Sequence, residues 1–456
     1  MKLLIKNGLL VTPDKTYKAD ILSEEGVIAR IDKNISEKAD EIINAEGKYV
    51  FSGGVDVHTH LNLALGDRKV SDGFYHGTVA AAFGGTTTII DHPEAGEKDC
   101  SLHHQPDMYK KNLEKEAVID YAVHGVFQRV DDAVLKEIPE LINDGIPSMK
   151  VYCTYDNMLT YNAIEKVIDV MDSSGGLTAF HAEDDAVIKE LQKKYGDEGR
   201  LEPIYHAKSR PDFSEADAIK QILKTAKGRP VYIVHLSTKK GLQVIKKAKA
   251  VGQAVIAETC PQYLLLTEER YNDPDGAKYI MAPPLRKQED CDALWEGLAD
   301  GTIDIVATDH CSFSYADKVK FGKDDFRRTP GGCPGVETRV PLLYSEGVAK
   351  GRITLERFSA LISENPAKKM GLYPRKGSLA VGSDADFFIM DTDISRKISV
   401  NTLHQKCDYT PFEGYEATGW PVTAVSRGEV IVNNGRFTGK RGRGVFLPRT
   451  PSKKED

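Results

Sequence analysis

In the middle of the 456-residue chain, short apolar runs alternate eight times with longer amphipathic segments. This alternation is typical of strand–helix units that form a parallel sheet. Eight such units favour a closed (β/α)8 barrel, and the lack of a G-x-G-x-x-G loop after the first strand argues against a doubly wound open sheet. We therefore predict an α/β protein built on a TIM-like barrel. The expected barrel strands are residues 54–58, 86–91, 119–127, 148–153, 177–181, 231–236, 254–258 and 303–308.

The two ends of the chain carry a different pattern, in which short apolar runs are separated by turn residues. Runs of this kind are typical of small antiparallel sheets. We expect the two ends to pair in one small β-sandwich-like domain. The predicted organisation is therefore a β-domain made of residues 1–51 and 376–456, with the barrel formed by residues 52–375 between them.

Polar side chains close several of the predicted strands. His58 and His60 end the first strand, and the two-residue period of a strand places both on one face. Barrel strands direct their carboxyl ends to a common mouth, so polar residues at later strand ends should converge on this pair. Imidazole and carboxylate ligands suit zinc and also accept manganese, cobalt or nickel. The later residues are Lys150, His181, His235 and Asp309.

Each of these residues also has an ordinary explanation when it is considered alone. A single histidine at a strand end is usually a hydrogen-bonded group of the core or rim. Lys150 could simply extend its ammonium group towards solvent. The metal-site interpretation depends on the recurrence of such residues at the ends of several strands, which the ordinary explanations would have to produce independently each time.

Four longer motifs accompany His58-Thr59-His60. They are Gly85-Thr86-Thr87-Thr88, Glu258-Thr259-Cys260-Pro261-Gln262-Tyr263-Leu264, Pro283-Pro284-Leu285-Arg286 and Ala307-Thr308-Asp309-His310-Cys311. Together these motifs resemble the hydantoinase and dihydropyrimidinase branch of the amidohydrolase superfamily, and the resemblance covers nearly the whole chain. Within this branch the chain is most similar to bacterial D-phenylhydantoinases, including the end Phe437-Thr438-Gly439-Lys440.

The resemblance implies two divalent metal ions per chain, with zinc as the expected metal. Carbon dioxide would carboxylate Lys150, and the carbamate would bridge the two ions together with a hydroxide. Position by position, one metal would take His58, His60, Lys150 and Asp309. The other would take Lys150, His181 and His235.

The implied reaction is hydrolysis of the ring amide of 5-monosubstituted hydantoins to N-carbamoyl amino acids. Asp309 would move the proton from the hydroxide to the leaving nitrogen. Tyr155 would donate to the oxyanion, although a tyrosine there could equally be rim packing. Ala282 and Gly331, where many family members carry serine and asparagine, would bind the ring's amide edge through main-chain groups. Candidates for a pocket around the ring substituent, or for mere loop packing, are Leu63, Leu65, Met158 and Leu159.

Several alternatives remain open. The nearest is a dihydropyrimidinase that acts on dihydrouracil or dihydrothymine, whose uncharged ring has the same cyclic ureide edge. Dihydroorotase and allantoinase are less favoured, because similar enzymes often carry arginine at the position of Asn62. A non-catalytic scaffold relative is the remaining alternative. Such relatives typically lose metal ligands, whereas this chain has all of them.

Charge and cysteine content limit the partners and the compartment. A net charge of −7 gives no field that attracts nucleic acid, so a small-molecule cyclic ureide is the expected partner. Seven cysteines without a C-x-x-C pair predict free thiols in the reducing cytoplasm. Neither a signal-peptide core nor a membrane-spanning run is expected, so no membrane association is predicted. The family resemblance implies a homotetramer.

Overall fold

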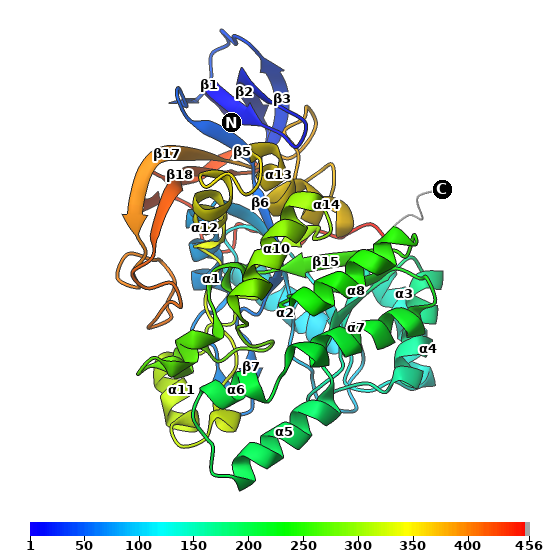
Figure 1. The fold of residues 1–456 in the computed structure, drawn as a ribbon. Helices are drawn as coiled ribbons and strands as arrows, with labels where there is room; N and C mark the ends of the chain where they lie inside the picture. Colours follow the sequence, from blue (N-terminus) through cyan, green and yellow to red (C-terminus); the bar gives the residue numbers. More distant parts are fainter. Residues whose placement is uncertain (452–456) are drawn as a thin grey trace.

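The computed structural model describes residues 1–451, and a closed barrel of parallel strands lies at its centre (Figure 1). The first and last strands close the ring where the Asp309 amide donates to the His58 carbonyl at 2.9 Å and Thr59 pairs with His310. The predicted barrel is therefore confirmed. Its strands are β6 (Gly54–Thr59), β9 (Thr86–Asp91), β10 (Asp120–Val123) continued by β11 (Gly125–Val126), β12 (Ser148–Tyr152), β13 (Leu177–His181), β14 (Val231–Ile233), β15 (Val255–Thr259) and β16 (Ile305–Val306).

Three barrel strands differ from the prediction by more than one residue at an end. The expected strand 119–127 is interrupted at His124, so that β10 pairs with β9 while β11 pairs with β12. The strands expected at 231–236 and 303–308 are shorter in the structure. β14 ends shortly before the turn at His235, whose φ is 39°, whereas β16 is shorter at both ends and stops before Asp309, whose φ is 53°.

The barrel is filled by alternate side chains of its strands and tied together by one buried arginine. Val55, Tyr232 and Ile305 belong to this interior cluster and are completely buried. Arg339 is also completely buried and donates to the carbonyls of Val55 and Val306 at 3.0 and 2.9 Å. Its other terminal nitrogen donates to the Thr86 hydroxyl at 2.9 Å, so one side chain connects β6, β9 and β16.

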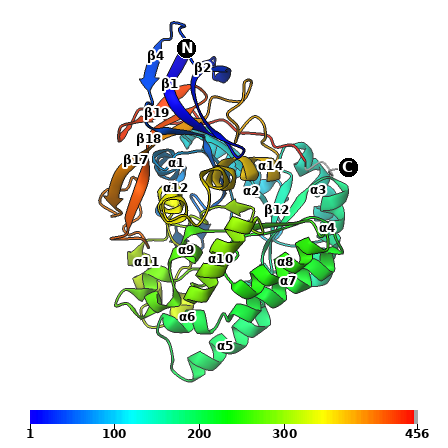
Figure 2. The same cartoon turned by 45° about the horizontal axis from the view of Figure 1, so that its top comes forward.

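Helices cover the outside of the barrel, and α3, α4, α7, α8 and α10 pack side by side in that order (Figure 2). Local sequence sets their ends: the Thr238 hydroxyl caps α8 by accepting from the Gly241 amide at 3.0 Å, and Gly252 follows its end with φ of 83°. The helices are α1 (Phe74–Phe83), α2 (His104–Glu116), α3 (Asp132–Asn143), α4 (Tyr161–Ser173), α5 (Asp185–Asp197), α6 (Ile204–Lys208), α7 (Asp212–Ala226), α8 (Lys239–Ala250), α9 (Pro261–Leu265), α10 (Gln288–Asp300), α11 (Tyr315–Gly322), α12 (Arg339–Leu343), α13 (Leu355–Ser359) and α14 (Asn365–Lys369).

The two ends of the chain form one sheet outside the barrel, drawn in blue and orange in Figure 1. They meet where β5 pairs antiparallel with β17, with Phe51 opposite Phe388. This confirms the predicted pairing of the ends. Residues 452–456 of the predicted C-terminal part lie outside the described residues. The strands are β1 (Lys2–Val11), β2 (Thr16–Glu24), β3 (Val27–Asp32), β4 (Glu41–Asn44), β5 (Tyr49–Ser52), β17 (Phe387–Lys397), β18 (Glu416–Ser426), β19 (Glu429–Asn433) and β20 (Arg436–Phe437).

The chain returns to the barrel after this sheet. The Tyr121 amide in β10 donates to the Val445 carbonyl at 3.0 Å, and the Leu447 amide donates back to the Tyr121 carbonyl at 2.7 Å. The buried Arg449 then donates to the Val123 carbonyl at 2.7 Å. Residues 445–449 thus lie beside β10, on the edge that does not pair with β9. None of the helices in residues 1–451 is long and apolar enough to cross a membrane.

Candidate metal centre

Three potential metal ligands meet at the carboxyl end of the barrel. His58 lies in β6, His60 follows that strand, and Asp309 lies just beyond β16. One carboxylate oxygen of Asp309 is 3.3 Å from His58 Nε2 and 3.2 Å from His60 Nε2. The ligand atoms of the three residues all lie within 4.8 Å of one another, which is close enough for one ion. His58 is completely buried.

The other three predicted ligands surround this triad. Lys150 lies in β12, and its Nζ is 3.3 Å from His58 Nε2. The His235 ring centroid is 5.4 Å from that of His58 and 4.6 Å from that of His181. His235 Nδ1 is buried without a hydrogen-bond partner in the described chain. The structure therefore brings all six predicted ligands together at one end of the barrel.

The protonation states of these residues suit a metal site. Burial, with Lys150 beside it, holds the pKa of His58 well below its usual range. Burial also lowers the pKa of His235 strongly, and that of Lys150 to about 8. Neutral imidazoles have a free lone pair for a metal, and a lysine near this pKa is partly neutral at physiological pH. The donor set thus fits divalent metal ions.

Three residues of the site have a backbone conformation that L-amino acids rarely adopt. The φ angles of Tyr155, His235 and Asp309 are 77°, 39° and 53°. The left-handed region is sterically unfavourable for side chains with a Cβ atom, and such residues concentrate at functional sites. Here the unusual turn follows a barrel strand in each case, and it directs the side chain over the barrel mouth.

A buried glutamate orients the His58 ring and holds the backbone of His235. His58 Nδ1 lies 2.7 Å from Glu258 Oε1 in β15, and the His235 amide donates to the same oxygen at 3.0 Å. The Tyr232 hydroxyl donates to the other carboxylate oxygen. With Nδ1 held by Glu258, His58 presents Nε2 to the centre of the site.

A second carboxylate holds His181. Glu183 Oε2 lies 2.8 Å from His181 Nε2 and also accepts from the Arg210 guanidinium. Burial opposes ionisation of Glu183, but Arg210 and His181 outweigh it and lower the pKa of the carboxyl to about 2. The Arg210 guanidinium also lies 5.7 Å from the Tyr155 ring centroid, so it connects the environment of His181 with that of Tyr155.

The candidate substrate residues occupy different environments. Tyr155 keeps 37% of its surface exposed, and its ring centroid is 5.1 Å from that of His181. Leu65 and Met158 are also exposed. Leu63 packs in a small buried cluster and Leu159 in the main core, so their side chains contact the protein's own loops.

Ala282 and Gly331 lie on neighbouring segments. A Cβ atom placed on Gly331 would lie 4.0 Å from the Met281 Cα atom, and the Gly332 amide donates to the Ile280 carbonyl at 3.1 Å. Within the described residues, the amide of Gly331 and the carbonyl of Ala282 make no hydrogen bond to the protein. These main-chain groups remain available to a ligand.

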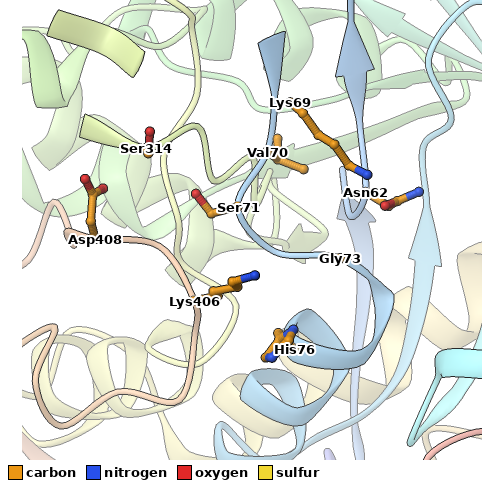
Figure 3. Close-up of a pocket in the computed structure, with 9 residues that line it drawn as sticks. All are labelled: Asn62, Lys69, Val70, Ser71, Gly73, His76, Ser314, Lys406 and Asp408. Atoms are coloured by element: carbon orange, nitrogen blue, oxygen red, sulfur yellow. The ribbon is translucent and has the colours of Figure 1, made fainter. Parts of the chain in front are cut away.

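A separate pocket of about 500 Å³ lies beside the hairpin formed by β7 (Ala64–Leu65) and β8 (Arg68–Lys69) (Figure 3). Asn62 lines this pocket, and its side-chain oxygen lies 3.8 Å from where a Cβ atom of Gly73 would be. None of the six candidate ligands lines the pocket, but Asn62 lies only two residues after His60. Its lining residues are Asn62, Lys69, Val70, Ser71, Gly73, His76, Ser314, Lys406 and Asp408.

Comparison with known proteins agrees with this geometry. The amidohydrolase family model matches residues 49–431. A D-phenylhydantoinase of Escherichia coli O1:K1 / APEC is 47% identical over 455 residues, which is 99% of each chain. This chain belongs to the amidohydrolase family. Among solved structures, a D-hydantoinase aligns with a TM-score of 0.97 at 40% identity, and the dihydropyrimidinase from Brevibacillus agri NCHU1002 with 0.98 at 38% identity. Both alignments cover 100% of each chain.

The structure gives physical roles to amidohydrolase motif residues for which the sequence predicts none. Besides Glu258, the Gln262 side chain donates to the Thr308 carbonyl at 3.0 Å, and the Tyr263 hydroxyl donates to the Pro283 carbonyl at 2.8 Å. The motif after β15 thus supports both the Asp309 turn and the Ala282 segment.

The sequence does not predict the supporting roles of Glu258, Glu183 and Arg210. For Glu183 a signal exists, because it lies two residues after His181 and can share its face. The contact between His58 and Glu258 spans 200 positions, and nothing in the local sequence indicates it.

Proposed function

We propose that this amidohydrolase opens the ring amide of 5-monosubstituted hydantoins and releases N-carbamoyl amino acids. The observation that carries the proposal is the convergence of six potential ligands at the barrel mouth. The full-length similarity to a D-phenylhydantoinase supports the choice of ring.

The site would hold two divalent metal ions, and zinc suits its histidine-rich donor set. His58, His60 and Asp309 would hold one ion, His181 and His235 the other, and carboxylated Lys150 both. When bound, such ions activate water as a nucleophile near neutral pH and polarise a carbonyl oxygen. Metal analysis of the purified protein separates this proposal from a non-catalytic scaffold, which would not retain metal.

Carboxylation of Lys150 forms an N–C bond to carbon dioxide and releases a proton. The reaction requires the neutral amine, and burial of Lys150, which lowers its pKa to about 8, supplies a neutral fraction at physiological pH. The resulting carbamate would place two oxygens where the amine nitrogen now lies close to His58.

The protein's own side chains would handle the proton and the developing negative charge. The Asp309 carboxylate would take a proton from the attacking water and pass it to the leaving ring nitrogen. The Tyr155 hydroxyl would donate to the oxygen of the tetrahedral intermediate. The free main-chain groups of Ala282 and Gly331 would hold the amide edge of the ring.

Residues at the rim of the barrel mouth would select which substituent the ring carries. Of the four apolar candidates, Leu65 and Met158 have exposed side chains, so we assign them to the substituent pocket. Leu63 and Leu159 would support the loops that carry them. An acidic ring such as dihydroorotate would lack a charge-assisted contact at Asn62.

A dihydropyrimidinase activity is the second candidate, because a solved dihydropyrimidinase has the same fold over its full length. Comparison of kcat/KM for D- and L-5-phenylhydantoin, dihydrouracil, dihydroorotate and allantoin decides between the two. We expect D-5-phenylhydantoin to be the best substrate. A clear preference for dihydrouracil would move the assignment to dihydropyrimidinase, and a preference for dihydroorotate or allantoin would contradict both candidates.

The same proposal includes a homotetramer in the cytoplasm. The seven cysteines are all free thiols, which supports a reducing compartment. Light scattering coupled to size-exclusion chromatography measures the mass of the assembly directly, and a monomer would contradict this part of the proposal.

A further inference from the structure

Lys318 is an unusual lysine, because it lies on α11 and is completely buried. Its ammonium group donates to the Ile280 carbonyl at 2.8 Å and to the Pro330 carbonyl at 2.7 Å. No carboxylate within residues 1–451 forms an ion pair with it. A lysine is rarely buried without a charged partner, since the loss of hydration is costly. Its charge is therefore compensated by the two carbonyl dipoles.

The two carbonyls belong to the segments that carry Ala282 and Gly331. Ile280 precedes Ala282 by two residues, and Pro330 directly precedes Gly331. The same region is held by the Gly332 amide, which donates to the Ile280 carbonyl, and by His206 Nε2, which lies 2.7 Å from the Met281 carbonyl. Lys318 is thus the side chain that bonds both segments at once.

We infer that Lys318 is a positioning residue that sets the spacing of the two main-chain segments which bind the amide edge of the ring. The inference rests on the proposed function, because that function assigns the ring edge to Ala282 and Gly331. A compact ammonium group can draw two carbonyl oxygens towards one point, and an apolar side chain of equal length cannot. Burial lowers the pKa of Lys318 to about 8, which agrees with an ammonium held without a carboxylate.

The test replaces Lys318 by methionine, which preserves length and apolar contacts but has no donor. Lys318→Arg retains donors for both carbonyls, and Lys318→Gln retains a shorter donor for one. The matched control is Lys320→Met, an exposed position on the same helix. The measurements are KM and kcat for 5-phenylhydantoin, metal content, and hydrogen–deuterium exchange of peptides that cover residues 276–285 and 327–335.

We expect Lys318→Met to raise KM roughly tenfold or more. This is the scale of losing one well-placed neutral hydrogen bond between the main chain and the amide edge of the ring. The two metals should remain and kcat should change much less, since the cluster at the barrel mouth is untouched. Exchange should accelerate in the two peptides but not in one that covers β6. Lys318→Arg should recover most of the KM, and Lys320→Met should match the wild type.

An unchanged KM in Lys318→Met overturns the inference, as does a loss of metal that accounts for all of the lost activity. If Lys318→Met does not fold, the same criteria apply to Lys318→Gln. If the wild-type protein opens none of the rings, the proposed function fails, and the exchange measurement still decides the role of Lys318. Unchanged exchange in both peptides would then show that it does not position them.

Discussion

At the scale of single residues, the candidate centre depends on backbone conformations that the surrounding contacts must enforce. A non-glycine residue in the left-handed region costs on the order of 1–3 kcal/mol. Asp309 is held there by the bond from its amide to the His58 carbonyl, and His235 by the bond from its amide to Glu258. The strained positions of Asp309 and His235 are therefore fixed by contacts to another candidate ligand or to its supporting group.

Replacing Lys150 by alanine should remove both metals and the activity. The alanine side chain cannot carry a carbamate, so the group that joins the two halves of the site is lost. Elemental analysis and the initial rate of ring opening measure the two effects. Short carboxylic acids should restore part of each. A fully active Lys150→Ala protein would exclude the carbamate.

Tyr155→Phe should lower kcat roughly a hundredfold or more, which is the scale of losing one oxyanion donor. Metal content and melting temperature should stay unchanged, because the Tyr155 ring remains and the residue is partly exposed. Tyr161→Phe, at an exposed tyrosine at the start of α4, is the matched control. A parallel fall of metal content and activity would instead mean that Tyr155 supports the metal site.

Glu258→Gln should weaken metal binding by about 10–100-fold, the usual effect of losing the carboxylate behind a histidine ligand. The amide has nearly the same shape, so folding should be retained while His58 is oriented less well. Competition with a chelator measures the affinity. Glu269→Gln, on an exposed position, serves as the control. Equal affinity in the variant and the wild type would contradict the role of Glu258.

At the scale of the secondary-structure elements, the Arg339 side chain adds to the main-chain closure of the barrel, because it bonds β6, β9 and β16. Arg339→Met would leave the carbonyls of Val55 and Val306 without their donor, and each such buried group costs about 1–3 kcal/mol. We expect the free energy of unfolding to fall by about 3 kcal/mol or more in a denaturant titration. Arg436→Met, on the exposed β20, should change it by less than about 0.5 kcal/mol. A similar small effect for Arg339→Met would contradict this assignment.

Sequence patterns predict strands well where nothing competes with the pattern. The predicted bounds of β9 and β13 agree with the structure, because each is a continuous buried run that ends in a polar residue. The predicted bounds of β14 and β16 are wrong: β14 ends before the turn at His235, and β16 covers only residues 305–306 of the expected 303–308. Candidate ligands are visible in the sequence because strand ends converge. The role of Lys318 is not visible in the sequence, because its partners are main-chain carbonyls of other segments.

At the scale of the whole molecule, the barrel and the sheet from the chain ends share a buried charge cluster. Lys376 Nζ lies 2.7 Å from Asp120 in β10, 2.9 Å from Asp384 and 2.8 Å from Asp386. The last two residues precede β17, which pairs with the N-terminal strands. One ammonium group thus joins the barrel to the sheet.

Lys376→Met should therefore destabilise the whole protein by about 3–5 kcal/mol, because the buried carboxylates of Asp120 and Asp386 and the partly buried Asp384 lose their common cation. Thermal and denaturant unfolding measure the change. Lys368→Met is the matched control, because this lysine is exposed and its ion pair with Glu364 is of the weak i, i+4 kind. Equal stability of the two variants would show that the cluster does not join the two parts.

The segment beside β10 has a consequence for protein synthesis. Arg449 donates to the Val123 carbonyl across 326 positions of sequence. At ribosomal rates of about 5–20 residues per second, Arg449 is synthesised on the order of 15–65 s after Val123. Throughout that interval the edge of β10 that residues 445–449 cover in the folded protein lacks this partner. Covering of this edge is therefore a late event of translation, and we expect the growing chain to expose an unpaired strand edge to other chains until then.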